Sequence, residues 1–87
     1  MTEAEIEQTI ADFAQAAVFA KEAGYDGVEV MGSEGYLINE FTAPCTNHRT
    51  DQWGGSFENR IRFPLRIIQA VRAATGPNFI LMYRLSV

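Results

Sequence analysis

Apolar residues recur at helical spacing through the first part of the chain. They are Ile6, Ile10, Phe13, Ala14, Ala17 and Ala20. Steps of three and four place such residues on one face of a helix. Thr2, with Glu5 three positions later, forms a capping-box pattern, and Gly24 is a typical residue just after a helix end. We therefore predict a helix over residues 3–23, with alanines on its buried face that favour close packing against a sheet.

Two short apolar runs lack this spacing and indicate strands. The first, 27–31, is bounded by Gly27 and Gly32. The second, 79–85, is continuously apolar except for Arg84. Runs of this kind are typical of parallel strands that are buried on both faces. We predict two parallel strands joined by a helical connection.

The segment between the strands ends in a second helical pattern. We predict a helix over residues 57–75, capped by Ser56 and stopped at Gly76. Its predicted buried face consists of Ile61, Leu65, Ile68 and either Val71 or Arg72. Pro64 lies inside the pattern and lacks the backbone N–H that a helix interior uses. A kink, or a separate first turn before residue 64, is therefore expected.

Residues 32–56 form a long polar connection, and loops of this length inside a compact α/β unit usually carry function. A polar cluster continues from this functional loop into the next helix, and we interpret it as a hydrogen-bonded scaffold for the loop, with Trp53 packing the loop. The cluster consists of Arg49, Asp51, Glu58, Asn59, Arg60 and Arg62. The order helix–strand–helix–strand has too few strands for a self-sufficient domain. The sequence therefore predicts a piece of a larger α/β barrel or sheet.

Composition excludes several classes of protein. The 87 residues are 47% hydrophobic and 21% charged, with a net charge of −4, which argues against general binding to nucleic acids or anionic membranes. No apolar run approaches the ~20 residues of a membrane span, and the acidic N-terminus is unlike a signal peptide. One cysteine excludes an intrachain disulfide and fits a reducing compartment, so a cytoplasmic location is expected. Cys45 and His48 lack a second pair of ligands, and we predict no metal site.

Two side chains are candidates for chemistry. Tyr36 follows the first strand at its carboxyl end, where barrel enzymes carry catalytic groups. A tyrosine with a pKa of about 10 keeps its proton at neutral pH and can donate it to a developing carbanion. Arg84 interrupts an apolar strand and could be a fixed cation beside a cofactor. The alternatives are a packing role for Tyr36 and an ion pair with a nearby carboxylate for Arg84.

Four motifs carry a resemblance to a known family. They are Asp26–Val30, Gly35–Leu37, the run Thr46–Phe63 with its Thr-Asn-x-Arg and Gly-Gly-Ser-x-Glu-Asn-Arg elements, and Arg84–Ser86. Over essentially its whole length the chain resembles the old yellow enzyme-like flavin oxidoreductases, which are TIM barrels. The resemblance implies an α/β fold that is part of a (β/α)8 barrel. Residues 31–39 and 83–86 are most similar to the branch of bacterial NADPH-dependent 2,4-dienoyl-CoA reductases, since Met31 and Glu34 replace histidines that typical members carry.

The resemblance also implies cofactors and roles. FMN would lie at the carboxyl-terminal mouth of the strands, in contact with Arg84, and NADPH would supply electrons through FAD and a 4Fe-4S cluster outside this chain. Tyr36 matches the tyrosine that protonates the α-carbon after hydride transfer to the far end of a conjugated diene, aided by a histidine beyond this chain. Cys45, Thr46, Asn47 and His48 match the segment that borders the bound acyl-CoA. The implied activity is reduction of conjugated C=C bonds of enoyl thioesters in fatty acid β-oxidation.

Two other functions stay open. One is a truncated or engineered barrel piece without activity that serves only as a folding or assembly unit. The other is a part of another old yellow enzyme-like NAD(P)H:flavin oxidoreductase. With two strands, the side chains of Val28, Val30, Ile80 and Met82 would lack cover. We therefore expect the isolated chain to associate with itself or with the remainder of its barrel, and not to bind FMN tightly or reduce an enoyl substrate alone.

Overall fold

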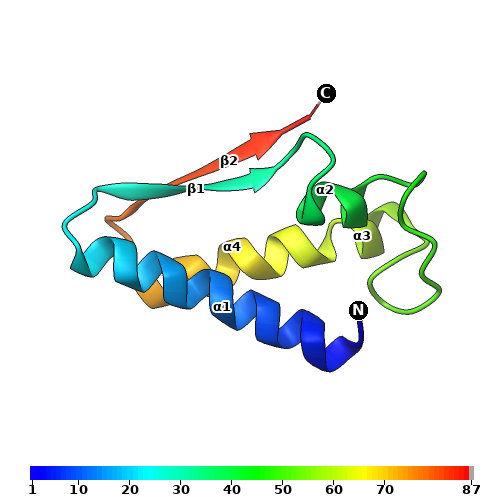
Figure 1. Ribbon diagram of the computed structural model, residues 1–87, viewed down its shortest axis with the longest axis horizontal. Coiled ribbons are helices and arrows are strands. Elements are labelled where there is room, and N and C mark those ends of the chain that lie inside the picture. Colours follow the sequence, from blue (N-terminus) through cyan, green and yellow to red (C-terminus); the bar gives the residue numbers. More distant parts are fainter. Residues whose placement is uncertain (87) are drawn as a thin grey trace.

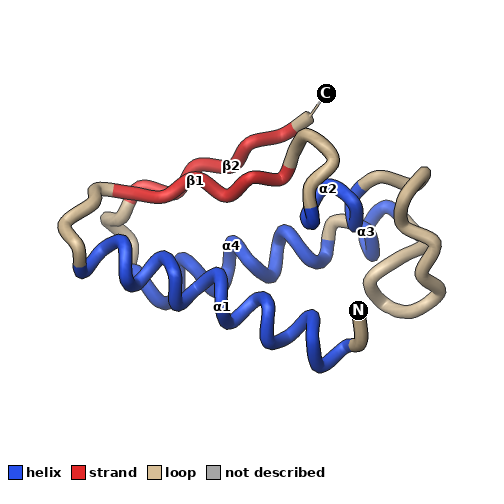
Figure 2. The backbone as a smooth tube through the Cα atoms, in the orientation of Figure 1, coloured by secondary structure: helices blue, strands red, loops and turns tan. Residues whose placement is uncertain are grey.

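The computed structural model describes residues 1–86 and has two layers (Figure 1). Its elements are α1 (Glu3–Glu22), β1 (Gly27–Gly32), α2 (Leu37–Thr42), α3 (Phe57–Arg60), α4 (Arg62–Thr75) and β2 (Ile80–Leu85). β1 and β2 form a parallel two-stranded sheet, and α1 and α4 lie side by side along one face of it. Figure 2 shows that α2, α3 and the long loop gather at the carboxyl end of the strands. The predicted α/β order with parallel strands is confirmed.

The first helix forms as its sequence predicts. The Thr2 side chain accepts a hydrogen bond from the Glu5 backbone N–H, and the Glu5 carboxylate accepts one from the Thr2 N–H, which completes the capping box. Ile6, Ile10 and Ala17 are buried on the face that meets α4. At the other end, Lys21 Nζ donates to the backbone oxygen of Thr75 at 2.7 Å and joins the ends of α1 and α4.

Only one face of the sheet is covered, because both long helices lie on the same side. The pairs on the helix side are Val28 with Leu81 and Val30 with Tyr83. On the opposite side the side chains of Ile80 and Met82 are 55% and 57% exposed. The apolar runs are typical of strands buried on both faces, but in this chain only the helix side of the sheet is covered. Val30 is only 4% exposed, so the expectation that it lacks cover is wrong, whereas Ile80 and Met82 do lack it.

The helix predicted over 57–75 is divided into α3 and α4 at Ile61. A continuous helix would need an N–H from Pro64 to the carbonyl of Arg60, and the proline ring would clash there. The chain therefore starts a new helix, and Pro64 lies in its first turn, where no such N–H is required. The buried face of α4 consists of Phe63, Pro64, Ile67, Val71 and Thr75. The predicted face was wrong at Leu65, which is 47% exposed, because apolar residues occur on both sides of α4 and only one side meets the core.

The segment predicted as a loop over 32–56 contains a helix, α2, and a buried aromatic cluster. Ile38 and Phe41 of α2 are buried, and the Phe41 and Phe63 rings lie 4.4 Å apart between centroids. Trp53 is fully buried and meets Phe63 edge-on, which confirms that Trp53 packs the loop. Burial of these side chains stabilises a helix that is too short to form alone.

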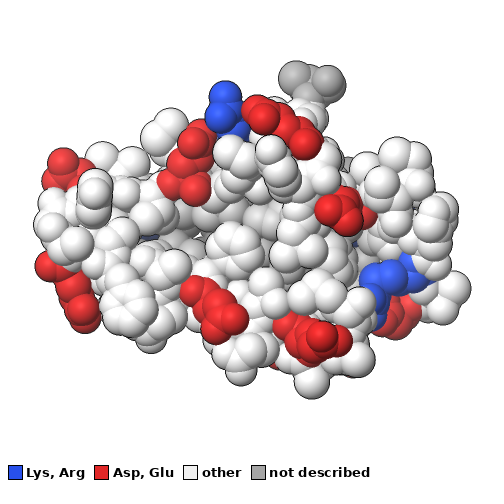
Figure 3. Space-filling model, viewed as in Figure 1, with Lys and Arg blue, Asp and Glu red and all other residues white. Residues whose placement is uncertain are grey.

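Charged groups on the surface are mostly acidic. Figure 3 shows Asp and Glu side chains spread over the viewed face, with Lys and Arg in only a few places. This distribution agrees with the net charge of −4. Within residues 1–86, no helix combines the length and the apolar character that a membrane crossing requires.

Candidate functional site

The turn that follows β1 presents Tyr36 to solvent. We call residues Ser33–Tyr36 the Tyr36 turn. Its backbone is left-handed at Glu34 (φ 63°) and Gly35 (φ 77°), a conformation that L side chains rarely adopt. Tyr36 then serves as the N-cap residue of α2, and its side chain is 61% exposed. The reversal of direction in the turn therefore brings the predicted acid to the surface just beyond the strand.

The Tyr36 turn is fixed from both sides. The Gly35 N–H donates to Oδ1 of Asn39 at 2.8 Å, which joins the turn to α2. The Glu34 N–H donates to the Ser86 hydroxyl at 2.9 Å, which joins it to the end of β2. Beneath the turn, the Tyr83 side chain in its present position leaves room only for glycine at residue 32, because a Cβ there would lie 1.9 Å from the Tyr83 hydroxyl oxygen. Burial raises the pKa of Tyr83 above its usual value.

Arg84 lies near the carboxyl end of β2, at the same end of the sheet as the Tyr36 turn. It pairs with Met31 in the register and lies on the face that the helices leave open. Its Nε is 3.8 Å from the Glu34 carboxylate, and both side chains are about half exposed. The ion pair expected as an alternative is thus present, with a long N–O distance. A cation on an open face could bind the edge of a flavin that gains negative charge on reduction.

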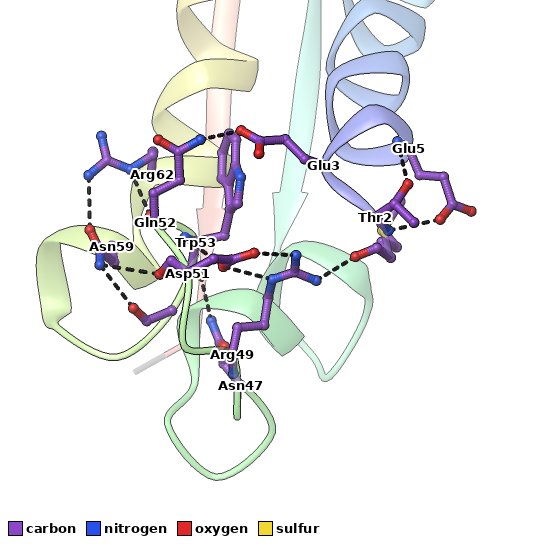
Figure 4. A network of polar contacts seen from close by, with 12 residues as sticks. Thr2, Glu3, Glu5, Asn47, Arg49, Asp51, Gln52, Trp53, Asn59 and Arg62 are labelled. Carbon is purple, nitrogen blue, oxygen red and sulfur yellow. Dashed lines mark hydrogen bonds and ion pairs between the residues drawn. The ribbon is translucent and has the colours of Figure 1, made fainter.

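The long loop between α2 and α3 is organised around one side chain. We call residues 43–56 the Asn47 loop (Figure 4). Asn47 Nδ2 donates to the backbone oxygens of Phe41 and Trp53 at 2.6 and 2.8 Å, and its Oδ1 accepts from the Arg49 N–H at 3.0 Å. Gly54 completes this arrangement, because a Cβ there would lie 2.6 Å from Asn47 Oδ1. The polar groups of Asn47 are therefore committed to the loop itself.

An arginine–carboxylate pair closes the next part of the loop. Arg49 binds Asp51 through two hydrogen bonds of 3.1 and 2.6 Å and also donates to the Met1 backbone oxygen. The hydrogen bonds from Arg49 lower the pKa of Asp51, and Asp51 in turn raises the pKa of Arg49. Asp51 also accepts from the Trp53 N–H, and Gln52 donates to the Glu3 carboxylate (Figure 4). These contacts tie the Asn47 loop to the start of α1.

The remaining members of the predicted cluster satisfy backbone oxygens. Arg60 donates to Thr42 and Gly55, Arg62 donates to Gln52, and Asn59 donates to Gly54, at distances from 2.7 to 3.1 Å. The interpretation of this cluster as a scaffold is confirmed for these residues, and Glu58 is exposed. Long loops carry many backbone oxygens that are not paired within a helix or a sheet, and side-chain donors of this kind provide their hydrogen bonds.

The predicted substrate segment divides into two kinds of residue. Thr46 donates its hydroxyl to the Glu40 backbone oxygen at 2.7 Å, so its polar group, like that of Asn47, serves the loop. Cys45 is an exposed free thiol, and the His48 side chain is exposed as well. A shallow depression of about 190 Å³ lies beside this segment. It is lined by Met1, Leu37, Glu40, Phe41, Thr46, Asn47, His48 and Arg49. Within residues 1–86, no cluster of three or more His, Cys, Asp or Glu residues could bind a metal ion.

Two features of the site were not found by sequence reasoning. The contact between Ser86 and Glu34 joins residues 52 positions apart, and no local pattern indicates it. The contact of Tyr83 with Gly32 depends on the register of the two strands. For the second contact the sequence held one indication, Gly32 itself, because a glycine in or next to a strand often marks a position that another group approaches closely.

Known proteins resemble both the sequence and the structure. The chain is 50% identical over 82 residues to an NADH oxidase of Thermoanaerobacter brockii, which covers 94% of this chain and 13% of that protein. It is 54% identical over 81 residues to an NADPH dehydrogenase of a Geobacillus species, which covers 92% of this chain and 24% of that protein. The chain thus spans a quarter or less of the length of these relatives.

Two solved structures contain the same arrangement of elements. The 2-naphthoyl-CoA reductase in complex with 2-naphthoyl-CoA matches 98% of this chain and 13% of its own length, with 46% identity and a TM-score of 0.96. Morphinone reductase in complex with tetrahydroNAD matches 95% of this chain and 23% of its own, with 46% identity and a TM-score of 0.89. These matches confirm the resemblance to old yellow enzyme-like proteins and the fold as part of their TIM barrel. Residues 1–87 match the pattern of one family throughout, and the chain belongs to the NADH:flavin oxidoreductase / NADH oxidase family, whose members use FMN and NAD(P)H.

Proposed function

We propose that the chain is a catalytic segment of a larger, flavin-dependent NADPH 2,4-dienoyl-CoA reductase. The observation that carries this proposal is the Tyr36 turn, which presents an exposed tyrosine hydroxyl at the same end of the sheet as Arg84. The similarity to a 2-naphthoyl-CoA reductase supports a CoA thioester as substrate. Met31 and Glu34 at the mouth of β1, in place of histidines, support the dienoyl-CoA branch over reduction of simple enones.

In this proposal each residue has one role. FMN, when bound, supplies the hydride that reduces the conjugated system, and NADPH renews it through FAD and a 4Fe-4S cluster elsewhere in the protein. Arg84 binds the flavin edge on which negative charge develops. Tyr36 donates its hydroxyl proton to the α-carbon of the thioester, so that one C=C bond is lost for each hydride and proton added. The exposed position of Tyr36 is consistent with access to a substrate.

The Asn47 loop would border the acyl-CoA. The polar groups of Thr46 and Asn47 already form hydrogen bonds with backbone oxygens of this chain. The exposed side chains of Cys45 and His48, together with the loop surface, would therefore contact the substrate. A product of this kind belongs to fatty acid β-oxidation, which we place in the cytoplasm. The remainder of the barrel is the partner that the open face of the sheet requires.

The test is Tyr36→Phe in the full-length flavoprotein, with Tyr25→Phe as matched control. Tyr25 is 69% exposed in the turn between α1 and β1, at the opposite end of the sheet. We expect Tyr36→Phe to lower dienoyl-CoA turnover by ~10²–10⁴-fold, the usual contribution of a positioned acid, while NADPH still reduces the flavin. Tyr25→Phe should match wild type. Unchanged turnover in Tyr36→Phe would refute the role of this residue.

A second candidate is another old yellow enzyme-like NAD(P)H:flavin oxidoreductase that acts on enones. The similarity to morphinone reductase favours it. Turnover of a 2,4-dienoyl-CoA and of a cyclic enone by the same wild-type preparation separates the two. A preference for the enone would overturn the dienoyl-CoA assignment but keep the flavoprotein class.

A further inference from the structure

The residue after the end of β2 makes a contact that the roles above do not use. Ser86 accepts a hydrogen bond from the Glu34 N–H at 2.9 Å, and the two residues are 52 positions apart. It is the backbone of the Tyr36 turn, and not a side chain, that is bound. A backbone contact fixes the path of the chain directly, so it constrains the position of the residues on either side of Glu34.

Glu34 needs such a contact because of its conformation. Its φ of 63° is in the left-handed region, where a side chain with a Cβ is strained. Conformations of this kind persist only where surrounding contacts determine them. Two contacts reach Glu34 from the end of β2 and the residue after it: the Ser86 hydroxyl binds the Glu34 N–H, and Arg84 Nε approaches the Glu34 carboxylate at 3.8 Å. The hydroxyl contact is the shorter of the two.

The hydrogen bond between Ser86 and Glu34 lies close in sequence to both candidate functional residues. Arg84 lies two positions before Ser86, and Tyr36 lies two positions after Glu34. The hydrogen bond between Ser86 and Glu34 therefore joins the segment that carries the proposed cofactor contact to the segment that carries the proposed acid. Within residues 1–86, this is the side-chain hydrogen bond that joins the Tyr36 turn to the residue after β2.

We propose that Ser86 is a positioning residue, which fixes the Tyr36 turn relative to Arg84 through the Glu34 N–H. This inference rests on the proposed function for its catalytic consequence. Catalytic groups need to be held within about 0.5 Å of their productive geometry, and errors of about 1 Å can cost 10²-fold in rate. The hydrogen bond to Ser86 adds such a constraint beyond the paired strand ends, where Gly32 lies opposite Leu85.

The experiment compares Ser86→Ala, Ser86→Thr and Gln15→Ala in the full-length flavoprotein. Thr keeps a hydroxyl acceptor, and Gln15 is exposed on α1, away from the site. Hydrogen exchange is measured for the peptide that contains residues 33–36. Turnover and KM for a 2,4-dienoyl-CoA and the FMN content are measured on the same preparations.

We expect Ser86→Ala to speed exchange of the Tyr36 turn by about tenfold, the upper range for loss of one hydrogen bond, and to lower kcat several-fold with little change in KM or FMN content. Ser86→Thr should restore both exchange and kcat, and Gln15→Ala should match wild type. Wild-type exchange or wild-type kcat in Ser86→Ala overturns the inference, as does a Ser86→Thr variant as impaired as Ser86→Ala.

A different variant, Tyr36→Phe, shows whether the proposed function itself is wrong. If Tyr36 has no role in protonation, Tyr36→Phe keeps wild-type turnover. The exchange of the Tyr36 turn still reports whether Ser86 fixes it, because exchange does not depend on activity.

Discussion

Replacement of Asn47 by Ala tests whether the Asn47 loop is stabilised by its internal hydrogen bonds. The substitution removes two donors and one acceptor, and it leaves the backbone oxygens of Phe41 and Trp53 and the N–H of Arg49 without these partners. Each hydrogen bond contributes about 0.5–1.5 kcal/mol net, so three of them give roughly 3 kcal/mol. Loss of that free energy favours the open loop by about 100-fold.

The assay is hydrogen exchange of peptides from residues 43–56, combined with trypsin cleavage after Arg49. Arg49 is bound to Asp51 and to the Met1 backbone oxygen, so cleavage there requires the loop to open. Both rates should rise by one to two orders of magnitude in Asn47→Ala. Exchange in the first turns of α1 should rise less, because the capping box there does not involve Asn47.

Two control variants separate this effect from a general loss of stability. His48→Ala changes an exposed neighbour in the same loop, and Asn78→Ala changes an exposed residue in the turn before β2. Both should keep the exchange and cleavage rates of wild type. If Asn47→Ala also keeps them, the hydrogen bonds of Asn47 do not stabilise the loop and the division of the substrate segment into internal and exposed side chains is wrong.

Two further predictions follow from the charge and burial of other residues. Arg49 lowers the folded pKa of Asp51. The pair therefore stabilises the fold above the unfolded pKa of about 3.9, and this stability is lost as the pH falls through the lower folded value. Hydrogen exchange of peptides from residues 43–56, compared at equal pH, should therefore differ between wild type and Asp51→Asn at pH 7 and converge in acid. Both side chains are partly exposed, so the difference should be small, and a difference that grows in acid would contradict this reasoning. The 87-residue chain alone should self-associate through its open sheet face and fail to bind FMN tightly, and Met82→Lys should shift it toward monomer in sedimentation. A stable wild-type monomer that binds FMN at micromolar affinity would refute this.

Much of the fold was predictable because its signals are local. The capping box and Gly24 bound α1, and Pro64 breaks the second helical pattern where its missing N–H and its ring require. The first strand was found from a short β-rich run bounded by Gly27 and Gly32, and the second from a continuous apolar run. In contrast, α2 has only six residues, less than the window in which helical spacing can be recognised, and it is stabilised by burial of Ile38 and Phe41.

For the candidate site, the sequence indicated which residues to consider but not how they are connected. Tyr36 and Arg84 were found from their positions relative to strands, and the structure brings both to one end of the sheet. The link through Ser86 joins residues too far apart in sequence to be paired by any local pattern. The three hydrogen bonds of the Asn47 side chain also depend on how residues 41 to 54 fold together. The spacing of residues along the sequence does not determine that folding.

The Asn47 loop and the two-stranded sheet differ in how completely this chain supplies their contacts. The polar side chains of the Asn47 loop bind backbone and side-chain groups of this same chain, so the geometry of the loop is set by the residues present. The sheet is satisfied on one face only, and its other face carries apolar Ile80 and Met82 beside the charged Arg84. A half-exposed cation among exposed apolar side chains is stable in water but would be costly to bury without an anionic partner. The face that needs the rest of a barrel for cover therefore carries a cation that needs an anionic partner when buried. Glu34, at 3.8 Å, is one such partner, and in the function proposed above reduced flavin would be a second.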